Sequence, residues 1–133
     1  MNDAPEHTTK LLAAYAADKK ASDLQVVDLR GVSGYTDFFV ICTGTSDRQV
    51  KAIHDGIQLG MKREHGLTPR RVEGLTESRW VLMDYLDAVV HIFTPDMRDH
   101  YRLDQLWGDV PRLPIDEAEL TALVPVGSAP AAS

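Results

Sequence analysis

Hydrophobic residues recur along the 133-residue chain with two kinds of spacing, and these predict where helices and strands lie. A helical spacing predicts a first helix over Thr9–Lys20, and a β-favouring stretch predicts a strand over Leu24–Leu29. Phe38–Cys42 is a continuous apolar run, which is typical of a central strand covered on both faces. A second helix is expected to begin after Ser46, where the sequence has the form of a capping box, and to end at Gly66.

The second half of the chain predicts three further strands and another helix. A short strand is expected at Arg70–Glu73, and Trp80–Asp84 is expected to form a hairpin with Ala88–Phe93. Thr94–Asp96 has the pattern of a helix start, because proline suits the first helical position and an acid stabilises the positive end of the dipole. This helix is predicted to end at Gly108 and to bury Tyr101, Leu103, Leu106 and Trp107. The order of elements indicates an α/β fold in which helices flank a mixed five-stranded sheet.

The composition changes near Gly108, which predicts a domain boundary. Residues 1–109 are interpreted as one folded domain, and residues 110–133 as a Pro- and Ala-rich, flexible C-terminal tail. A short helix around Asp116–Leu123 is the ordered element that this tail could contain.

The charge of the chain bears on its partners. The net charge is −6 and the pI is about 5.2, whereas a domain that binds nucleic acid through its phosphates normally carries a basic face. The acidic balance therefore argues against primary RNA or DNA binding and favours a basic protein as partner. The single cysteine, Cys42, excludes an intrachain disulfide, and neither a membrane span nor a signal peptide is visible. We therefore expect the protein in the cytoplasm.

The junction at Gly44–Ser46 is the first candidate for chemistry. A glycine turn that opens a helix can bind phosphate on free backbone amides. A second glycine at P-loop spacing and a following Lys-Ser/Thr are both missing, so the junction lacks a Walker motif. The simpler interpretation is a capped helix after a tight turn.

Three carboxylates form the second candidate. Glu73, Asp84 and Asp87 could serve a metal-dependent nucleotidyl transferase if they converged on a divalent ion. Asp84 and Asp87 are three residues apart across a turn, so a strand would not present both on one face. The alternative is that they shape the turn and face solvent or a partner.

Histidine and cysteine give weaker signals. His91 lies in an apolar strand, and the scattered histidines form no pattern of metal-ligand spacing. Cys42 lies inside an apolar run without a basic neighbour, which is typical of an inert buried thiol. The sequence therefore predicts neither a metal site nor a cofactor site.

Acidic and aromatic residues are interleaved between Glu73 and Asp87. Strand alternation places Trp80, Leu82 and Asp84 on one face, and Val81, Met83 and Tyr85 on the other. One of these faces should be core, and aromatic residues rimmed by acids on the other would be typical of a protein interface. The alternative, that Trp80 is itself core, stays open at this point.

Several linked motifs resemble the Iojap/RsfS family of ribosomal silencing factors. They are Tyr35–Ser46, Val72–Gly74, Trp80–Asp84, Val90–Phe93 and Tyr101–Asp109. Together they span most of the chain in the family's order, and a linked set is more specific than any one motif.

The resemblance implies a fold similar to the nucleotidyltransferase fold but without its catalytic carboxylates. It implies a protein that is not an enzyme, binds the large-subunit ribosomal protein numbered fourteen (uL-fourteen) near the intersubunit face, and needs no cofactor. Docking there would block association of the subunits and repress translation under nutrient limitation, and the free protein would be a homodimer. The residues that match the family's surface are Glu73, Trp80, Asp84, Tyr85, Asp87 and His91.

One position departs from the family pattern. Leu86 stands where the hairpin turn usually has glycine. If the turn needs a positive φ, leucine would add strain of about 1 kcal/mol. Two other functions stay open: a metal-dependent nucleotide enzyme that uses the three carboxylates, and a dimeric scaffold for another partner.

Overall fold

Five strands form a single mixed sheet in the computed structural model, which describes residues 4–32, 34, 36–101 and 108–125. The strand order is β1-β2-β5-β4-β3, and β2 and β5 are parallel whereas the other neighbours are antiparallel. The strands are β1 (Ser22–Asp28), β2 (Phe38–Thr43), β3 (Arg71–Glu73), β4 (Trp80–Asp84) and β5 (Ala88–Phe93). The helices are α1 (Ala4–Asp18), α2 (Asp47–His65), α3 (Pro95–Tyr101) and α5 (Glu117–Leu123). The α/β fold class predicted from the sequence is confirmed.

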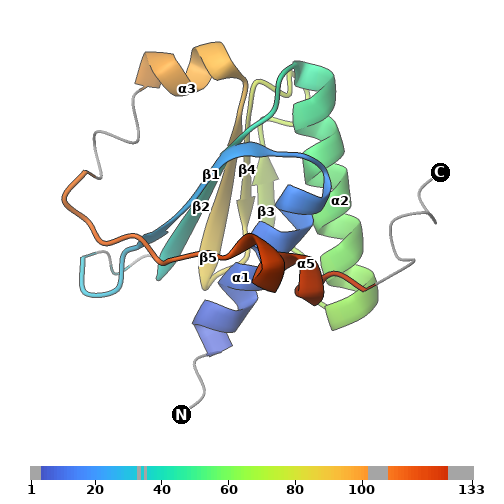
Figure 1. Cartoon of the computed structure of the whole chain (residues 1–133). Helices are drawn as coiled ribbons and strands as arrows, with labels where there is room; N and C mark the ends of the chain where they lie inside the picture. The colour runs from blue at the N-terminus through green and yellow to red at the C-terminus, as the bar shows by residue number, and fades with distance from the viewer. Residues whose placement is uncertain (1–3, 33, 35, 102–107, 126–133) are drawn as a thin grey trace.

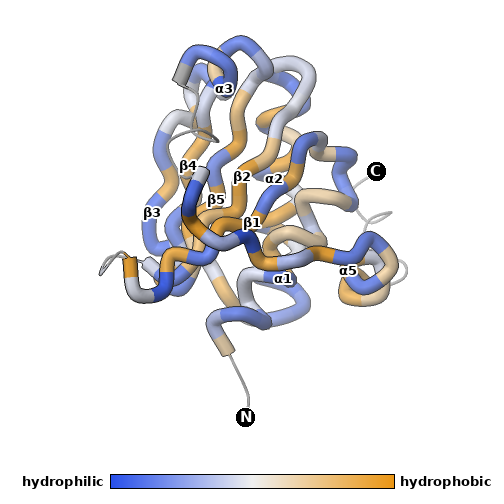
Figure 2. The backbone as a smooth tube through the Cα atoms, turned by 60° about the vertical axis from the view of Figure 1, so that its left-hand side comes forward, coloured by the Kyte–Doolittle hydropathy of each residue, from blue (hydrophilic) through white to orange (hydrophobic). Residues whose placement is uncertain are grey.

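Helices α1, α2 and α5 lie together on one face of the sheet, whereas α3 lies beyond one end of the strands (Figure 1). The main hydrophobic core fills the space between these helices and the inward-facing side chains of the strands. The two central strands, β2 and β5, are hydrophobic along most of their length, as Figure 2 shows, while α3 is mainly hydrophilic. Burial of these two hydrophobic strands therefore stabilises the centre of the sheet.

Local signals set the ends of α2. Ser46 has extended backbone angles and its side chain accepts a hydrogen bond from the Gln49 amide, which makes it the N-cap. Gly66 ends the helix with a φ of 67°, in the left-handed region. Both predicted boundaries are confirmed. The Gln49 side chain, however, accepts from the backbone amide of Thr45 at 2.6 Å, one residue before the partner that a capping box predicts.

Helix α1 packs closely against α2. The ring of Tyr15 lies over Gly60, and a Cβ atom added at that glycine would collide with it. A similar close approach joins the Lys19 side chain to Gly56. Glycines in the middle of a helix weaken it, so these two are best explained by the short distance between the helices.

The segment 110–125 is part of the folded domain, so the prediction of a flexible tail from residue 110 is wrong for these residues. Arg112 forms a β-bridge with Val27, and the Leu113 amide donates to the carbonyl of Val26 at 2.9 Å. Leu120 on α5 is buried against α1, which confirms the short helix. Residues 126–133 lie outside the described residues, as do most of the expected buried positions of the last predicted helix. Among the described residues, no helix is long and apolar enough to span a membrane.

Candidate functional site

The face of the sheet opposite α1 and α2 carries a second, smaller hydrophobic cluster. Its fully buried members come from β1, β2, β5 and the residue after β1: Val27, Leu29, Ile41 and Phe93. Phe39 and Trp80 pack against it and are only half-buried. Leu82, two residues beyond Trp80 on β4, is also half-buried and pairs with His91. We call Phe39, Trp80, Leu82, His91 and Phe93 the aromatic face.

Trp80 is held in place by two neighbours on β5. Its indole Nε1–H donates to Nδ1 of His91 at 3.2 Å. Its ring centroid lies 5.0 Å from that of Phe93, which is the residue paired with it across the strands. The indole therefore has one fixed orientation on the aromatic face, with part of its surface exposed.

His91 acts as a neutral hydrogen-bond acceptor in this arrangement. Its side chain is buried, and the Phe39 ring lies edge-on at a centroid distance of 4.5 Å. Burial lowers the pKa of His91 to about 4, so the imidazole carries no charge at neutral pH. Because Nδ1 accepts from Trp80, the proton must reside on Nε2, which has no hydrogen-bond partner among the described residues.

Asp84 is a structural carboxylate at the end of β4. It is only 3% exposed, although it lies on the same face of the strand as Trp80. One carboxylate oxygen lies 3.1 Å from Nε of Arg70, and the other accepts the backbone amide of Leu86 at 2.9 Å. This second bond closes the hairpin turn, in which Leu86 has a φ of 74°. Both oxygens are thus used within the chain.

Tyr85 does not belong to the aromatic face, although the resemblance placed it with Trp80 among the residues of the family's surface. It follows Asp84 on the opposite side of the strand, and its ring is buried in the main core beneath the helices. Burial also raises the pKa of its hydroxyl. The cause is strand alternation, which sends residues 80 and 85 to opposite faces.

Asp87 and Glu73 lie at the margins of the sheet. Asp87 is half-buried beside Asp37, and burial together with this neighbouring carboxylate raises its pKa. Glu73 is exposed on the edge strand, 3.1 Å from Nε of Arg71. The three predicted carboxylates thus have three separate environments. Within the described ranges, no three acidic, histidine or cysteine side chains are grouped so that they could hold a metal ion.

The Gly44–Ser46 junction has the geometry of a capped helix. The Gly44 amide donates to the carbonyl of Phe93, and the Thr45 amide to the side chain of Gln49. The amides of Arg48 and Gln49 donate to the side chains of Asp47 and Ser46. These four amides already donate hydrogen bonds within the protein, which favours the structural interpretation over a phosphate site.

Cys42 is fully buried, and burial raises the pKa of its thiol to about 12.

Sequence reasoning missed part of the face. Phe39 lies in the run that was expected to be covered on both sides, and Leu82 was assigned only to a strand face. Two signals together could have identified them: the alternation of side chains along each strand, and the pairing of residues between strands. Leu82 lies opposite His91, and Phe39 pairs with Val89, so each lies on the same face of the sheet as its partner. The partner of Asp84, Arg70, lies just before β3 and required the register of the strands.

Comparison with known proteins resolves the family. A sequence model of the family described as "Ribosomal silencing factor during starvation" matches residues 2–131. The chain belongs to this family, RsfS. The Bacillus subtilis protein named ribosomal silencing factor RsfS is 44% identical over 107 residues, which are 80% of this chain and 90% of that protein. The RsfS resemblance inferred from the linked motifs is thereby confirmed.

Two further proteins similar to this RsfS-family chain are informative, one because its structure is solved and one because of its name. A crystal structure of a Chromobacterium violaceum protein matches with a TM-score of 0.74 at 32% identity, over 86% of this chain and 96% of that one. A mouse protein, 29% identical over 99 residues, is named "Mitochondrial assembly of ribosomal large subunit protein 1". The match covers 73% of this chain and 43% of the mouse protein.

Proposed function

We propose that this RsfS-family protein binds a protein of the large ribosomal subunit through its aromatic face and thereby blocks association with the small subunit. The aromatic face carries the proposal because it places half-buried Trp80, Leu82 and Phe39 on one side of the sheet. Half-buried aromatic residues in a fixed orientation are typical interface anchors. The family's description as silencing factors and the mouse relative's name, which refers to the large subunit, support a ribosomal partner.

The proposed partner is a basic protein. The chain carries a net charge of −6, and the acids Glu73 and Asp87 lie at the margins of the sheet. Opposite charges accelerate association and disfavour other partners. The resemblance to the Iojap/RsfS family makes uL-fourteen, at the intersubunit face, the proposed partner. On the same basis we propose cytoplasmic action during nutrient limitation and a homodimer when the protein is free.

The proposed mechanism is steric and involves no turnover. Asp84, which a metal-dependent transferase would need, uses both oxygens in bonds within the chain. At the Gly44–Ser46 junction, the backbone amides of Gly44 and Thr45, which a nucleotide phosphate would need, already donate to internal partners. Repression should therefore follow the fraction of large subunits that carry the protein.

Sedimentation with purified large subunits tests this proposal. Leu82→Arg places a charge on the aromatic face at a half-buried position and should weaken binding at least tenfold, because it would bury an unpaired charge. Leu59→Arg is the matched control, since Leu59 is exposed on α2 at the opposite side of the molecule. Equal binding by both folded variants would contradict the assignment of the aromatic face.

A further inference from the structure

A hollow beside Trp80 extends the aromatic face. Its volume is about 260 Å³, and its walls come from the loop after β3, the start of β4 and helix α3. The lining residues are Gly74, Thr76, Glu77, Arg79, Trp80 and Met97. We propose that this hollow receives a lysine or arginine side chain of the partner, an inference that rests on the proposed function.

The charges around the hollow favour a cation. Glu77 is exposed, and in the described part of the chain it has no ion-pair partner. The guanidinium of Arg79 is already neutralised, because its Nη2 lies 2.8 Å from a carboxylate oxygen of Asp96. The hydroxyl of Thr94 donates to the other oxygen of Asp96 at 2.6 Å. One carboxylate is thus left without an internal cation, and an acidic side chain entering here would be repelled.

The uncharged walls suit the rest of a long basic side chain. The half-buried indole of Trp80 offers a surface that attracts a cation. Half-buried Met97 offers a flexible apolar contact for the methylene groups of lysine or arginine. A short aliphatic side chain would leave Glu77 without a counter-ion, so the combination favours a lysine or arginine.

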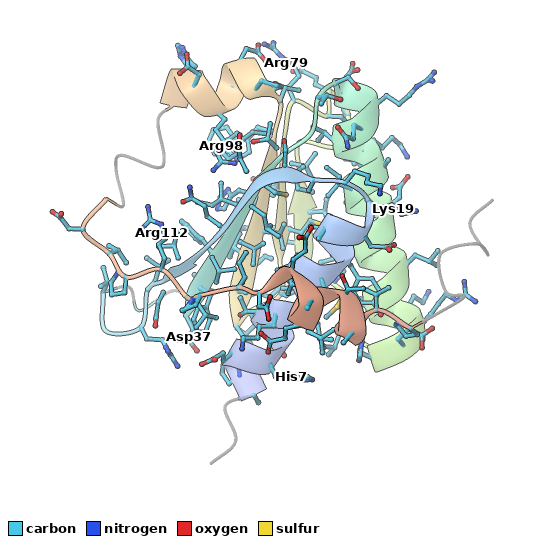
Figure 3. All side chains as sticks on the ribbon, viewed as in Figure 1. His7, Lys19, Asp37, Arg79, Arg98 and Arg112 are labelled. Carbon is cyan, nitrogen blue, oxygen red and sulfur yellow. The ribbon has the colours of Figure 1, made fainter. Side chains whose placement is uncertain are left out.

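The walls of the hollow are fixed before any partner binds. Gly74 has a φ of 85°, and a Cβ atom there would collide with the carbonyl oxygen of Trp80. The Ser78 amide donates to the carbonyl of Gly74 at 2.9 Å, which closes the loop. On the other wall, Arg98 anchors α3 by donating from Nη1 to the Asp23 carbonyl and the Thr43 hydroxyl. Figure 3 shows Arg79 beside α3, and Arg98 between α3 and the sheet. A prearranged pocket loses less entropy on binding.

Charge reversal at Glu77 tests the inference. We expect Glu77→Lys to weaken binding to purified large subunits about tenfold at 50 mM salt, and Glu77→Gln to weaken it by roughly two- to fivefold. Both effects should shrink at 300 mM salt, since an exposed ion pair is screened. Glu64→Lys makes the same change of net charge at an exposed position on α2 and should leave binding within about twofold of the parent.

A second variant tests the space itself. Thr76→Trp fills the hollow from an exposed position and should weaken binding about tenfold, whereas Thr121→Trp, also exposed but on α5, should not. If Glu77→Lys binds as well as Glu64→Lys while Leu82→Arg has lost binding, the hollow is not the site and the proposed function stands. If the parent protein itself does not bind large subunits, the proposed function and this inference are both overturned.

Discussion

The contact between Trp80 and His91 shows how a buried polar side chain can orient a half-buried aromatic one. The imidazole is buried among aromatic rings, which removes its charge and leaves Nδ1 as an acceptor for the indole N–H. The cost of burying a polar ring is offset in part by this hydrogen bond. His91 is therefore a positioning residue: it fixes the orientation of Trp80 without reaching the surface.

Burial of His91 should make the stability of the protein depend on pH. The ordinary pKa of histidine is 6.5 and the folded value is about 4, so the unfolded chain binds a proton between these values that the folded chain does not. The free energy of unfolding is therefore unaffected by the titration of His91 above pH 6.5 and decreases as the pH falls below that value. At pH 5 it should be lower by roughly 2 kcal/mol.

Urea unfolding at pH 7.5 and pH 5 measures this effect. Asparagine cannot titrate, so in His91→Asn the free energy of unfolding should fall between pH 7.5 and pH 5 by roughly 2 kcal/mol less than in the parent protein. His7→Asn, at an exposed position on α1, should retain the pH dependence of the parent. An identical pH dependence in the parent and His91→Asn would show that His91 is not neutral by burial.

Leu86 is a strained residue in the β4–β5 turn. Its φ of 74° lies in the left-handed region, and its amide is held by Asp84 at 2.9 Å. The strain anticipated from the departure at this position is therefore present in the backbone. We expect Leu86→Gly to be more stable than Leu86→Ala by about 1 kcal/mol in urea unfolding, since both remove the same exposed side chain and only glycine relieves the strain. Equal stability of the two variants would mean that the turn relaxes without cost.

At the scale of elements, local signals were sufficient where a cap or a periodic stretch marked the boundary. The limits of α2 followed from Ser46 and Gly66, and those of β4 and β5 from two β-favouring runs joined by a short turn. Residues 110–125 were misjudged because Pro111 and Pro114 interrupt any period, while their order comes from tertiary packing on β1 and α1. Amino-acid composition indicates the intrinsic conformational preference of a segment, but it contains no information about its contacts with distant parts of the chain.

Helix α5 should contribute measurably to the stability of the domain. Leu120 is 4% exposed in the main core, so Leu120→Ala is expected to lower the free energy of unfolding by about 2–4 kcal/mol. Thr121→Ala changes the next, exposed residue and should have an effect below about 0.5 kcal/mol. A negligible effect of Leu120→Ala in chemical denaturation would show that α5 is not part of the cooperative fold.

At the scale of the whole molecule, the sheet separates a side covered by helices from the side that carries the aromatic face, where we propose that the partner binds. Helices α1, α2 and α5 bury one face (Figure 1), and the other face presents aromatic residues with acids at its margins. The sequence predicted the sheet and the candidate residues, but alternation alone could not say whether Trp80 or Tyr85 faced the core. That choice depends on where the helices pack, which is a property of the whole chain.

The most direct test of the steric block is to mix purified large and small subunits with this protein at physiological salt and measure joined ribosomes by sedimentation. If the steric block operates, the protein travels with the large subunit and joined ribosomes decrease in proportion to its occupancy, whereas Leu82→Arg leaves joining unchanged. Binding to the large subunit with undiminished joining would contradict the steric mechanism, and absence from the large-subunit peak would contradict the proposed function.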